Sequence, residues 1–481
     1  MAGIVNITGV FAGADLPFTK VQKAVRVEPE ELSPGQPGFI RVYLLSKPGK
    51  GSHILSEVWL PKDWNGIFVG LGNGGMAGGI PHGSMLPYLK EGYAVACTDM
   101  GTSRGRDSGI GNPDVVRDFG WRATHLMTES AKRLVRLYYG EDACCSYFVG
   151  HSTGGQQALA EAQRFPEDYD GILGGVPANN RTHLHTYFLW AHNHFRPRGV
   201  GPLFSREDVY AITAAAVEYH QSVGDGVPGD DFVTLPRMDE SSIDEMLALI
   251  ARRVPALDSL RLDALRAVYR GPVNPRTGER IYNGIPAGAE RYGCGIYECQ
   301  REESPHFYPF VWTFGAEYNG YDFDFDRDMN RVNEVLAADL NANSADLSAF
   351  RDRGGRLILF SGSADPCVPY PDAMRYYDRV AAASGGYAAA MEFARWFLFP
   401  GRDHGSAGRG VSEVWADESG AGEMTALRRW REEGIAPDVL IGAAFRGGDA
   451  ASGIRFMRKI PAYDGTNLGA CPPVCADSCL K

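Results

Sequence analysis

The sequence lacks several features that would assign it to a familiar class. No apolar run is long enough to span a membrane. Basic residues are outnumbered, 48 against 59 acidic ones, and the net charge of −11 argues against nucleic acid or an anionic membrane surface as partner. The N-terminus, which begins with Met1–Asn6, has neither a basic segment nor an apolar segment followed by a cleavage site. We therefore expect no secretory signal and a cytoplasmic location, or secretion if a leader has been removed.

The sequence also lacks a regular cysteine framework. It has nine cysteines, an odd number, which suits a mostly reduced cytosolic protein of this length. They are Cys97, Cys144, Cys145, Cys294, Cys299, Cys367, Cys471, Cys475 and Cys479. Pairing of Cys294 with Cys299 stays open, as do a disulfide, a metal or a solvated tail for the last three. Their spacing is not a standard zinc pattern, so we predict no metal and no cofactor.

What is present is an alternation of solid apolar runs with helical patterns. Ile67–Leu71 and Tyr147–Val149 read as buried strands, and Trp121–Tyr139 has helical spacing. The pattern returns with Arg356–Phe360 and with Trp396–Phe399, which we expect to be the last strand before a closing helix. This alternation predicts a mostly parallel sheet covered by helices on both faces.

A segment of different character interrupts that alternation. It has helical pieces such as Phe204–His220 but no evenly spaced apolar strands. We therefore predict a sheet domain made of residues 1–178 and 346–481 and an inserted lid domain at 179–345. Four histidines of this segment form pairs that lie on different helical faces and lack a third ligand in the sequence, so we expect aromatic and polar lid contacts there and not a metal. They are His183, His185, His192 and His194.

Gly150-His151-Ser152-Thr153-Gly154 joins a predicted strand to a predicted helix. A strand, a sharp turn that carries serine, and a helix make up a nucleophile elbow. A serine hydroxyl needs a histidine base, and the histidine needs a carboxylate that orients it. In α/β-hydrolases these follow in the order Ser, acid, His.

That order selects the partners of Ser152. Of the eleven histidines, His404 alone follows the return of the sheet pattern, and Asp365 ends the preceding strand. Asp403 is adjacent to His404 and badly placed to bond its ring, while Asp352 lies before a strand and therefore at the wrong end of the sheet. We predict Ser152 as nucleophile, His404 as general base and acid, and Asp365 as the orienting carboxylate.

The oxyanion hole is predicted from two backbone segments. One donor is the N–H of Thr153, directly after the nucleophile, and the second comes from Gly74 or Gly75. These glycines follow the strand Ile67–Leu71. The rival interpretation, a phosphate-binding loop, fails because no Gly-Lys-Ser/Thr follows. Asp99 is expected to have a structural role, and His125 is expected to be packed or hydrogen-bonded.

Several longer stretches resemble the tannase and feruloyl esterase family of α/β-hydrolases. They are Phe119–Leu126, Ser152–Ala158, Phe165–Leu173, Asp346–Phe350, Ala364–Pro366 and Trp430–Asp438. The resemblance covers most of the chain. It implies an α/β-hydrolase catalytic domain with a large lid and hydrolysis of esters of aromatic acids through an acyl-enzyme.

The chain departs from that family at two places. Members typically join a cysteine before the serine to one after the histidine, and here those places hold His151 and Gly405. We hypothesise that the larger side chain opposite a glycine fills the same gap. The family's lid also binds calcium, but Gly224–Asp231 lacks the flanking cysteines and one carboxylate. We expect no calcium there.

The sequence thus favours a serine carboxylic-ester hydrolase for a small aromatic ester, feruloyl-like, galloyl-like or polyketide-derived. The alternative is an acyltransferase, a lactone-forming enzyme or a C–C bond hydrolase of aromatic secondary metabolism that uses the same triad. A non-catalytic binding protein is a third class, which the intact triad disfavours. The substrate-binding residues are unknown at this stage, and a homodimer is left open.

Overall fold

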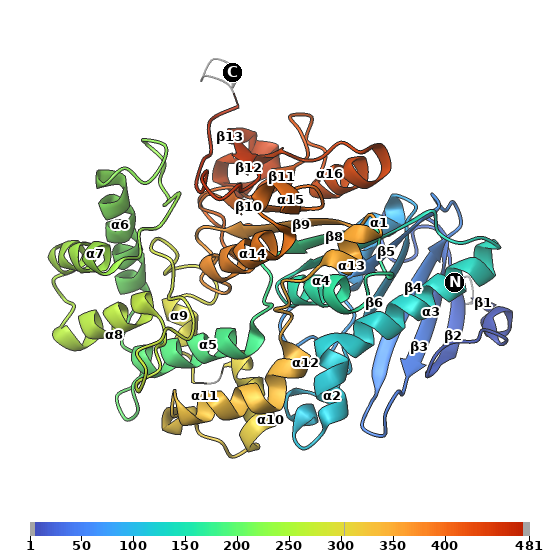
Figure 1. Cartoon of the computed structure of the whole chain (residues 1–481), viewed down its shortest axis with the longest axis horizontal. Helices are drawn as coiled ribbons and strands as arrows, with labels where there is room; N and C mark the ends of the chain where they lie inside the picture. Colours follow the sequence, from blue (N-terminus) through green and yellow to red (C-terminus); the bar gives the residue numbers. More distant parts are fainter. Residues whose placement is uncertain (1–4, 303, 475–481) are drawn as a thin grey trace. The chain divides into compact units, whose positions relative to one another are not determined.

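The computed structural model describes residues 5–302 and 304–474 (Figure 1). The chain divides into two compact units. Unit 1 holds residues up to 180 together with 308–318 and 333–357. Unit 2 holds 181–307, 319–332 and residues from 358 onward, so most of the predicted lid segment shares a unit with the C-terminal strands. The predicted domain boundaries at 178 and 346 stay a prediction.

Unit 1 is built on a twisted run of strands. They are β1 (Val5–Asn6), β2 (Thr19–Val27), β3 (Phe39–Ser46), β4 (Ile54–Pro61), β5 (Ile67–Leu71), β6 (Ala94–Thr98), β7 (Cys145–His151) and β8 (Gly171–Gly175). Their spatial order is β1-β2-β3-β4-β6-β5-β7-β8. The pairs from β1 to β6 are antiparallel, whereas β6, β5, β7 and β8 run parallel. Every residue of β5, β6 and β8 is buried, as the solid apolar runs predict for a covered sheet.

Helices of unit 1 cover these strands. Helix α1 (His82–Lys90) packs on β4, β5 and β6, α3 (Ala123–Tyr139) on β4 and β6, and α4 (Thr153–Arg164) on β7 and β8. The short elements are α2 (Pro113–Arg117), α10 (Tyr308–Phe314), α12 (Ala338–Leu340) and α13 (Ser348–Asp352). Helix α3 ends at Gly140, whose left-handed backbone (φ 83°) is the usual glycine cap.

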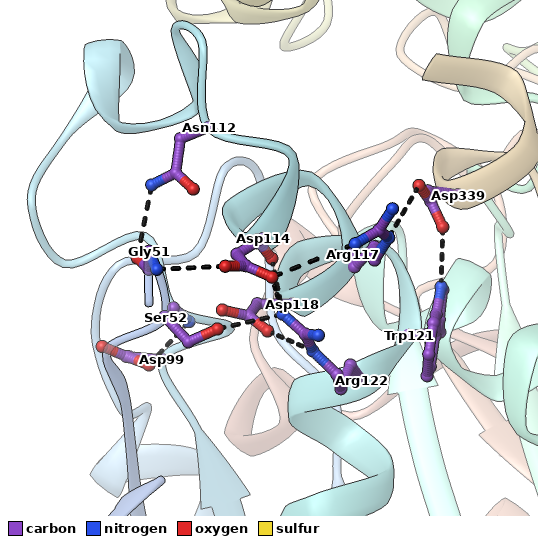
Figure 2. Close-up of polar contacts among 11 residues, drawn as sticks. Gly51, Ser52, Asp99, Asn112, Asp114, Arg117, Asp118, Trp121, Arg122 and Asp339 are labelled. Carbon is purple, nitrogen blue, oxygen red and sulfur yellow. Dashed lines mark hydrogen bonds and ion pairs between the residues drawn. The ribbon is translucent and has the colours of Figure 1, made fainter. Parts of the chain in front are cut away.

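A polar network fixes the segment before α3 to the loop ahead of β4 (Figure 2). In the π-helical turn η3 (Asp118–Arg122), the Arg122 Nε donates to the buried Asp118 at 2.7 Å. The same guanidinium donates to Ser52 Oγ at 2.9 Å and to Asp114 Oδ1 at 3.1 Å. Asp114 in turn accepts the Gly51 N–H at 3.0 Å. Arg122 therefore supplies the charge that a buried carboxylate needs.

Unit 2 contains an all-helical part. Its main helices are α5 (Arg181–Phe195), α6 (Arg206–Ser222), α7 (Glu240–Arg253) and α8 (Ser259–Arg270), with short α9 (Ile296–Cys299) and α11 (Arg327–Val332). Side chains at the residue before each helix explain where three of them begin. Ser205 forms a capping box with Asp208, and Asp239 and Asp258 accept backbone N–H groups of α7 and α8.

The C-terminal part of the chain adds strands and helices to unit 2. Strand β9 (Arg356–Gly362) enters it, followed by α14 (Pro371–Ser384), α15 (Tyr387–Ala390), β10 (Ala394–Phe399) and α16 (Glu423–Arg428). The predicted strands Arg356–Phe360 and Trp396–Phe399 lie within β9 and β10.

The expectation that Trp396–Phe399 is the last strand is wrong. A three-stranded antiparallel sheet follows, made of β11 (Glu413–Trp415), β12 (Val439–Phe445) and β13 (Ile454–Pro461). In β13 the buried row is Phe456, Arg458 and Ile460. Arg458 interrupts the alternation of apolar and polar residues that would have predicted a strand. The buried arginine is tolerated because Asp230 pairs with it at 2.9 Å.

Candidate active site

Ser152 lies at a strained turn between β7 and α4. Its backbone angles are φ 62° and ψ −116°, a region that side-chain-bearing residues rarely adopt. The Ser152 N–H donates to the Gly175 carbonyl at 3.0 Å, and the Ser152 carbonyl accepts the Ala178 N–H at 3.1 Å. Hydrogen bonds on both sides thus hold the serine in the conformation of a nucleophile elbow.

The glycines around Ser152 are required by close backbone approaches. A Cβ on Gly150 would collide with the backbone of Gly154. A Cβ on Gly155 would come within 2.6 Å of the Gly175 carbonyl oxygen. The flanking small residues of the motif are therefore a packing requirement of the turn.

The loop after β5 is attached to the elbow. The Gly154 N–H donates to the Asn73 carbonyl at 2.7 Å, and the Thr153 hydroxyl donates to the Gly75 carbonyl at 2.6 Å. A Cβ at Gly74 or Gly75 would meet nothing within 4 Å. The structure thus brings the three predicted oxyanion residues together beside Ser152 in unit 1.

Two buried amides that the sequence reasoning missed hold this loop. The Asn73 N–H donates to Gln157 Oε1 at 2.8 Å, and Asn73 Nδ2 donates to the Thr98 carbonyl at 2.7 Å. Gln157 Nε2 also donates to Thr124 Oγ1 at 2.8 Å. A signal was present, because Gln157 lies within a stretch that carries the family resemblance and Asn73 directly follows the buried strand.

Asp365 and His404 form a hydrogen-bonded pair in unit 2. His404 Nδ1 lies 2.8 Å from Asp365 Oδ2, and the carboxylate is fully buried. Asp365 Oδ1 accepts the N–H groups of Cys367 at 2.7 Å and Val368 at 2.9 Å. With both carboxylate oxygens occupied, the ring is held through Nδ1 and its Nε2 is left for other partners.

The electrostatics of this pair favour the imidazolium. Burial alone lowers the pKa of His404, but the charge and hydrogen bond of Asp365 outweigh burial and raise the pKa to about 9. Cys294 and Asp403 add smaller contributions of the same sign. A positive charge on the ring is thus well stabilised, which is what a base that accepts a proton requires.

The other sequence-selected residues have local partners. Asp403 accepts the Gly405 N–H at 3.1 Å. Asp99 accepts the N–H groups of Leu55 and Gly101 at 2.9 and 2.8 Å, in line with the structural role expected of it. His125 bonds Asp168 at 2.7 Å and stacks on Phe165, so the expectation that it is packed or hydrogen-bonded is confirmed. Ser152 belongs to unit 1, and its pairing with His404 stays a prediction.

The four lid histidines each have a backbone carbonyl within reach of Nδ1. The acceptors are the carbonyls of Ile281 for His183, His306 for His185, Cys299 for His192 and Trp190 for His194. One nitrogen of each ring is thus engaged by a backbone carbonyl.

In the loop Gly224–Asp231, which resembles a calcium site, the carboxylates already have partners within the protein. Asp225 Oδ2 accepts the Thr234 N–H at 2.8 Å. Asp230 pairs with Arg458, and Asp231 pairs with both Arg409 and Arg455. A calcium ion needs six to eight oxygen ligands free of competing cations, so these residues do not fit one. Of the tail cysteines, Cys471 is buried with a free thiol, and Cys475 and Cys479 lie outside the described residues.

Comparison with known proteins gives consistent matches. The family model "Tannase and feruloyl esterase" matches residues 40–304 and 312–466. An uncharacterized esterase of Xanthomonas campestris pv. campestris is 32% identical over 475 residues, which cover 89% of this chain and 81% of that protein. Feruloyl esterase B of Aspergillus niger is 28% identical over 443 residues, which cover 88% and 82%.

Solved structures match over nearly the whole chain. Feruloyl esterase B from Aspergillus oryzae superposes with a TM-score of 0.82 at 22% identity over 94% of each chain. Tannin acyl hydrolase from Aspergillus niger gives 0.74 at 18% identity over 98% of this chain and 95% of its own. The predicted α/β-hydrolase fold is confirmed.

Proposed function

Because this chain belongs to the tannase and feruloyl esterase family and is a carboxylic ester hydrolase, we propose that it hydrolyses esters of aromatic acids through an acyl-enzyme on Ser152. His404 serves as general base and then as general acid, and Asp365 orients the imidazole. The observation that carries the proposal is the 2.8 Å bond between His404 Nδ1 and the buried Asp365, in a chain whose Ser152 lies on a strained elbow.

Acylation follows from these residues. His404 Nε2 takes the Ser152 proton as the serine oxygen attacks the ester carbonyl, and Asp365 stabilises the imidazolium that forms. The N–H of Thr153 and that of Gly74 or Gly75 stabilise the oxyanion, each worth about 3 kcal/mol in the transition state. His404 then protonates the leaving alcohol. In deacylation, His404 takes a proton from water as the water attacks the acyl-enzyme, and it then returns the proton to Ser152 as the acid is released.

The substrate class rests on the relatives. Two of the similar fungal proteins are feruloyl esterases B and C. We propose that the substrate of this chain likewise has an aromatic acid part, and we leave its alcohol part unspecified. Acyl transfer, lactone formation or C–C bond hydrolysis by the same triad is the alternative proposed from the sequence. A cytoplasmic location and a homodimer also stay predictions.

The proposal is tested with p-nitrophenyl acetate and methyl ferulate. Ser152→Ala is expected to lower kcat by at least about 10³-fold, as removal of other serine nucleophiles does. Ser241→Ala, at an exposed position of α7, is the matched control and should retain the wild-type rate. Equal rates for wild type and Ser152→Ala would refute the nucleophile, and activity on the acetate without any on the ferulate would refute the aromatic substrate class.

A further inference from the structure

Three side chains that the proposed mechanism does not use meet in unit 2. Cys294 precedes α9, His306 lies in the turn Pro305–Phe307, and Cys367 follows Asp365 by two residues. The Cys294 and Cys367 sulfurs lie 2.8 Å apart, and Cys294 Sγ lies 3.6 Å from His306 Nε2. Residues 73 positions apart in sequence thus bring two thiols into contact.

The backbone of Cys294 is held in place independently of the thiol contact. It has a left-handed conformation at φ 67°, and its N–H donates to Glu298 Oε2 at 2.9 Å. The Cys299 thiol donates to the Cys294 carbonyl at 3.2 Å. Cys299 is therefore occupied elsewhere, and the partner presented to the Cys294 thiol is Cys367, which the sequence reasoning did not anticipate.

The two thiols differ in exposure. Cys294 is half-buried and lines a cavity of about 50 Å³ together with Phe188, Arg301 and His306. Cys367 is buried. A small oxidant therefore reaches Cys294 first, and Cys367 lies behind it.

The two thiols also differ in charge. The hydrogen bond with Cys367 is the largest influence on Cys294 and, together with the charges of His306 and His404, lowers the pKa of Cys294 to about 6 in spite of burial. The same hydrogen bond and burial raise the pKa of Cys367 well above its usual value. Near neutral pH the accessible sulfur is a thiolate, the nucleophilic form, and the buried one keeps its proton.

We propose that Cys294 is a redox-reactive thiol that forms a reversible disulfide with Cys367 when a hydroperoxide oxidises it. The Cys294 thiolate attacks a peroxide oxygen, the O–O bond breaks, and with one proton the products are Cys294 sulfenic acid and water or an alcohol. The Cys367 sulfur then attacks the Cys294 sulfur. The S–S bond forms, the S–O bond breaks, and the sulfenic oxygen leaves as water with the Cys367 proton.

A zinc site on the same residues fits the geometry less well. Two thiolates bound tetrahedrally to zinc at about 2.3 Å lie about 3.8 Å apart. The observed 2.8 Å is far shorter than that spacing and lies closer to the roughly 2.05 Å of a disulfide bond. Cys294, His306 and Cys367 also provide three ligands, one fewer than a structural zinc site uses.

The test uses the full chain, reduced and freed of reductant, then treated with hydrogen peroxide and mapped by mass spectrometry without reduction. The expected result is a cross-linked peptide pair that holds Cys294 and Cys367, reversed by dithiothreitol. Cys294→Ser should abolish the cross-link. Cys367→Ser should leave Cys294 as a sulfenic acid that dimedone traps. The control Cys144→Ser, at an exposed cysteine, should cross-link like wild type.

Alkylation of the unmodified wild type removes the dependence on variant folding. Iodoacetamide should label Cys294 with a midpoint near pH 6 and before Cys367. A Cys294–Cys299 cross-link, no dimedone label on Cys294, or one tightly bound zinc per chain that protects both thiols would overturn the proposal. Because none of these readouts uses ester hydrolysis, their failure is separable from failure of the proposed function.

Discussion

His404 Nδ1 lies 2.8 Å from Asp365 Oδ2, while Oδ1 of the same buried carboxylate accepts two backbone N–H groups. Both oxygens of Asp365 are therefore committed, one to the imidazole and the other to the turn that follows. The carboxylate fixes the ring orientation and stabilises a positive charge on it. The first role depends on the hydrogen bond of the side chain and the second on its negative charge.

Asp365→Asn keeps the shape of the side chain but removes its charge. We expect kcat on methyl ferulate to fall by about 10³- to 10⁴-fold, since an amide neither selects the required tautomer nor stabilises the imidazolium. Asp403→Asn is the control, because Asp403 accepts backbone N–H groups of its own loop, such as that of Gly405, and is sequence-adjacent to the base. A larger loss for Asp403→Asn than for Asp365→Asn would exchange their roles.

The pH dependence of kcat/KM follows from the pKa of His404. The base must be neutral to accept a proton, and Asp365 raises the pKa of His404 to about 9 against the effect of burial. The rate should therefore climb with pH through the neutral range, close to tenfold per pH unit well below the midpoint, and level off near pH 9. A profile that is flat from pH 6 to 9 contradicts this assignment.

The network in Figure 2 predicts a specific loss of stability. Arg122→Met leaves Asp118 buried without its cation and should lower the free energy of unfolding by about 3–5 kcal/mol. Arg117→Met is the matched control, since Arg117 is half-exposed and its nearest carboxylates lie 3.8 and 4.0 Å away. Urea unfolding measures both.

The double variant Asp118→Asn with Arg122→Met sharpens that experiment. Removal of the buried charge should restore part of the lost stability, because the cost of Arg122→Met comes mainly from the uncompensated carboxylate. Additive losses from the two substitutions would contradict this explanation.

Gly150 and Gly74 respond oppositely to the same substitution. Gly150→Ala should prevent stable folding, because its Cβ would collide with the Gly154 backbone. Gly74→Ala should fold with a melting temperature close to that of wild type, because its Cβ meets nothing within 4 Å. Thermal melts of the two variants decide whether the elbow is packed as described.

Calcium should not stabilise this protein through Gly224–Asp231. Three arginines and a backbone N–H occupy its carboxylates. The melting temperature is expected to be the same with millimolar calcium and with a chelator. A site filled at 100 times its Kd would add about 2.7 kcal/mol, so a clear upward shift would show that the loop rearranges to bind the ion.

The sequence predicted those features that depend on local pattern. Solid apolar runs identified β5 and β9, and chain order selected Asp365 and His404, which the structure joins. Sequence pattern failed to predict features that depend on contacts between residues far apart in the chain. Strand β13 was missed because Arg458 occupies its buried row and is neutralised by Asp230, which lies 228 positions earlier. The Cys294–Cys367 contact is equally non-local, and no spacing rule predicts it.

The measurement that tests the central claim most directly is the site of covalent acylation. The enzyme is mixed with p-nitrophenyl ferulate, quenched in acid within the first turnover, and digested for mass spectrometry. The account predicts a feruloyl group on the peptide that carries Ser152 and none in Ser152→Ala. A feruloyl group on another residue, or rapid turnover that persists in Ser152→Ala, would contradict it.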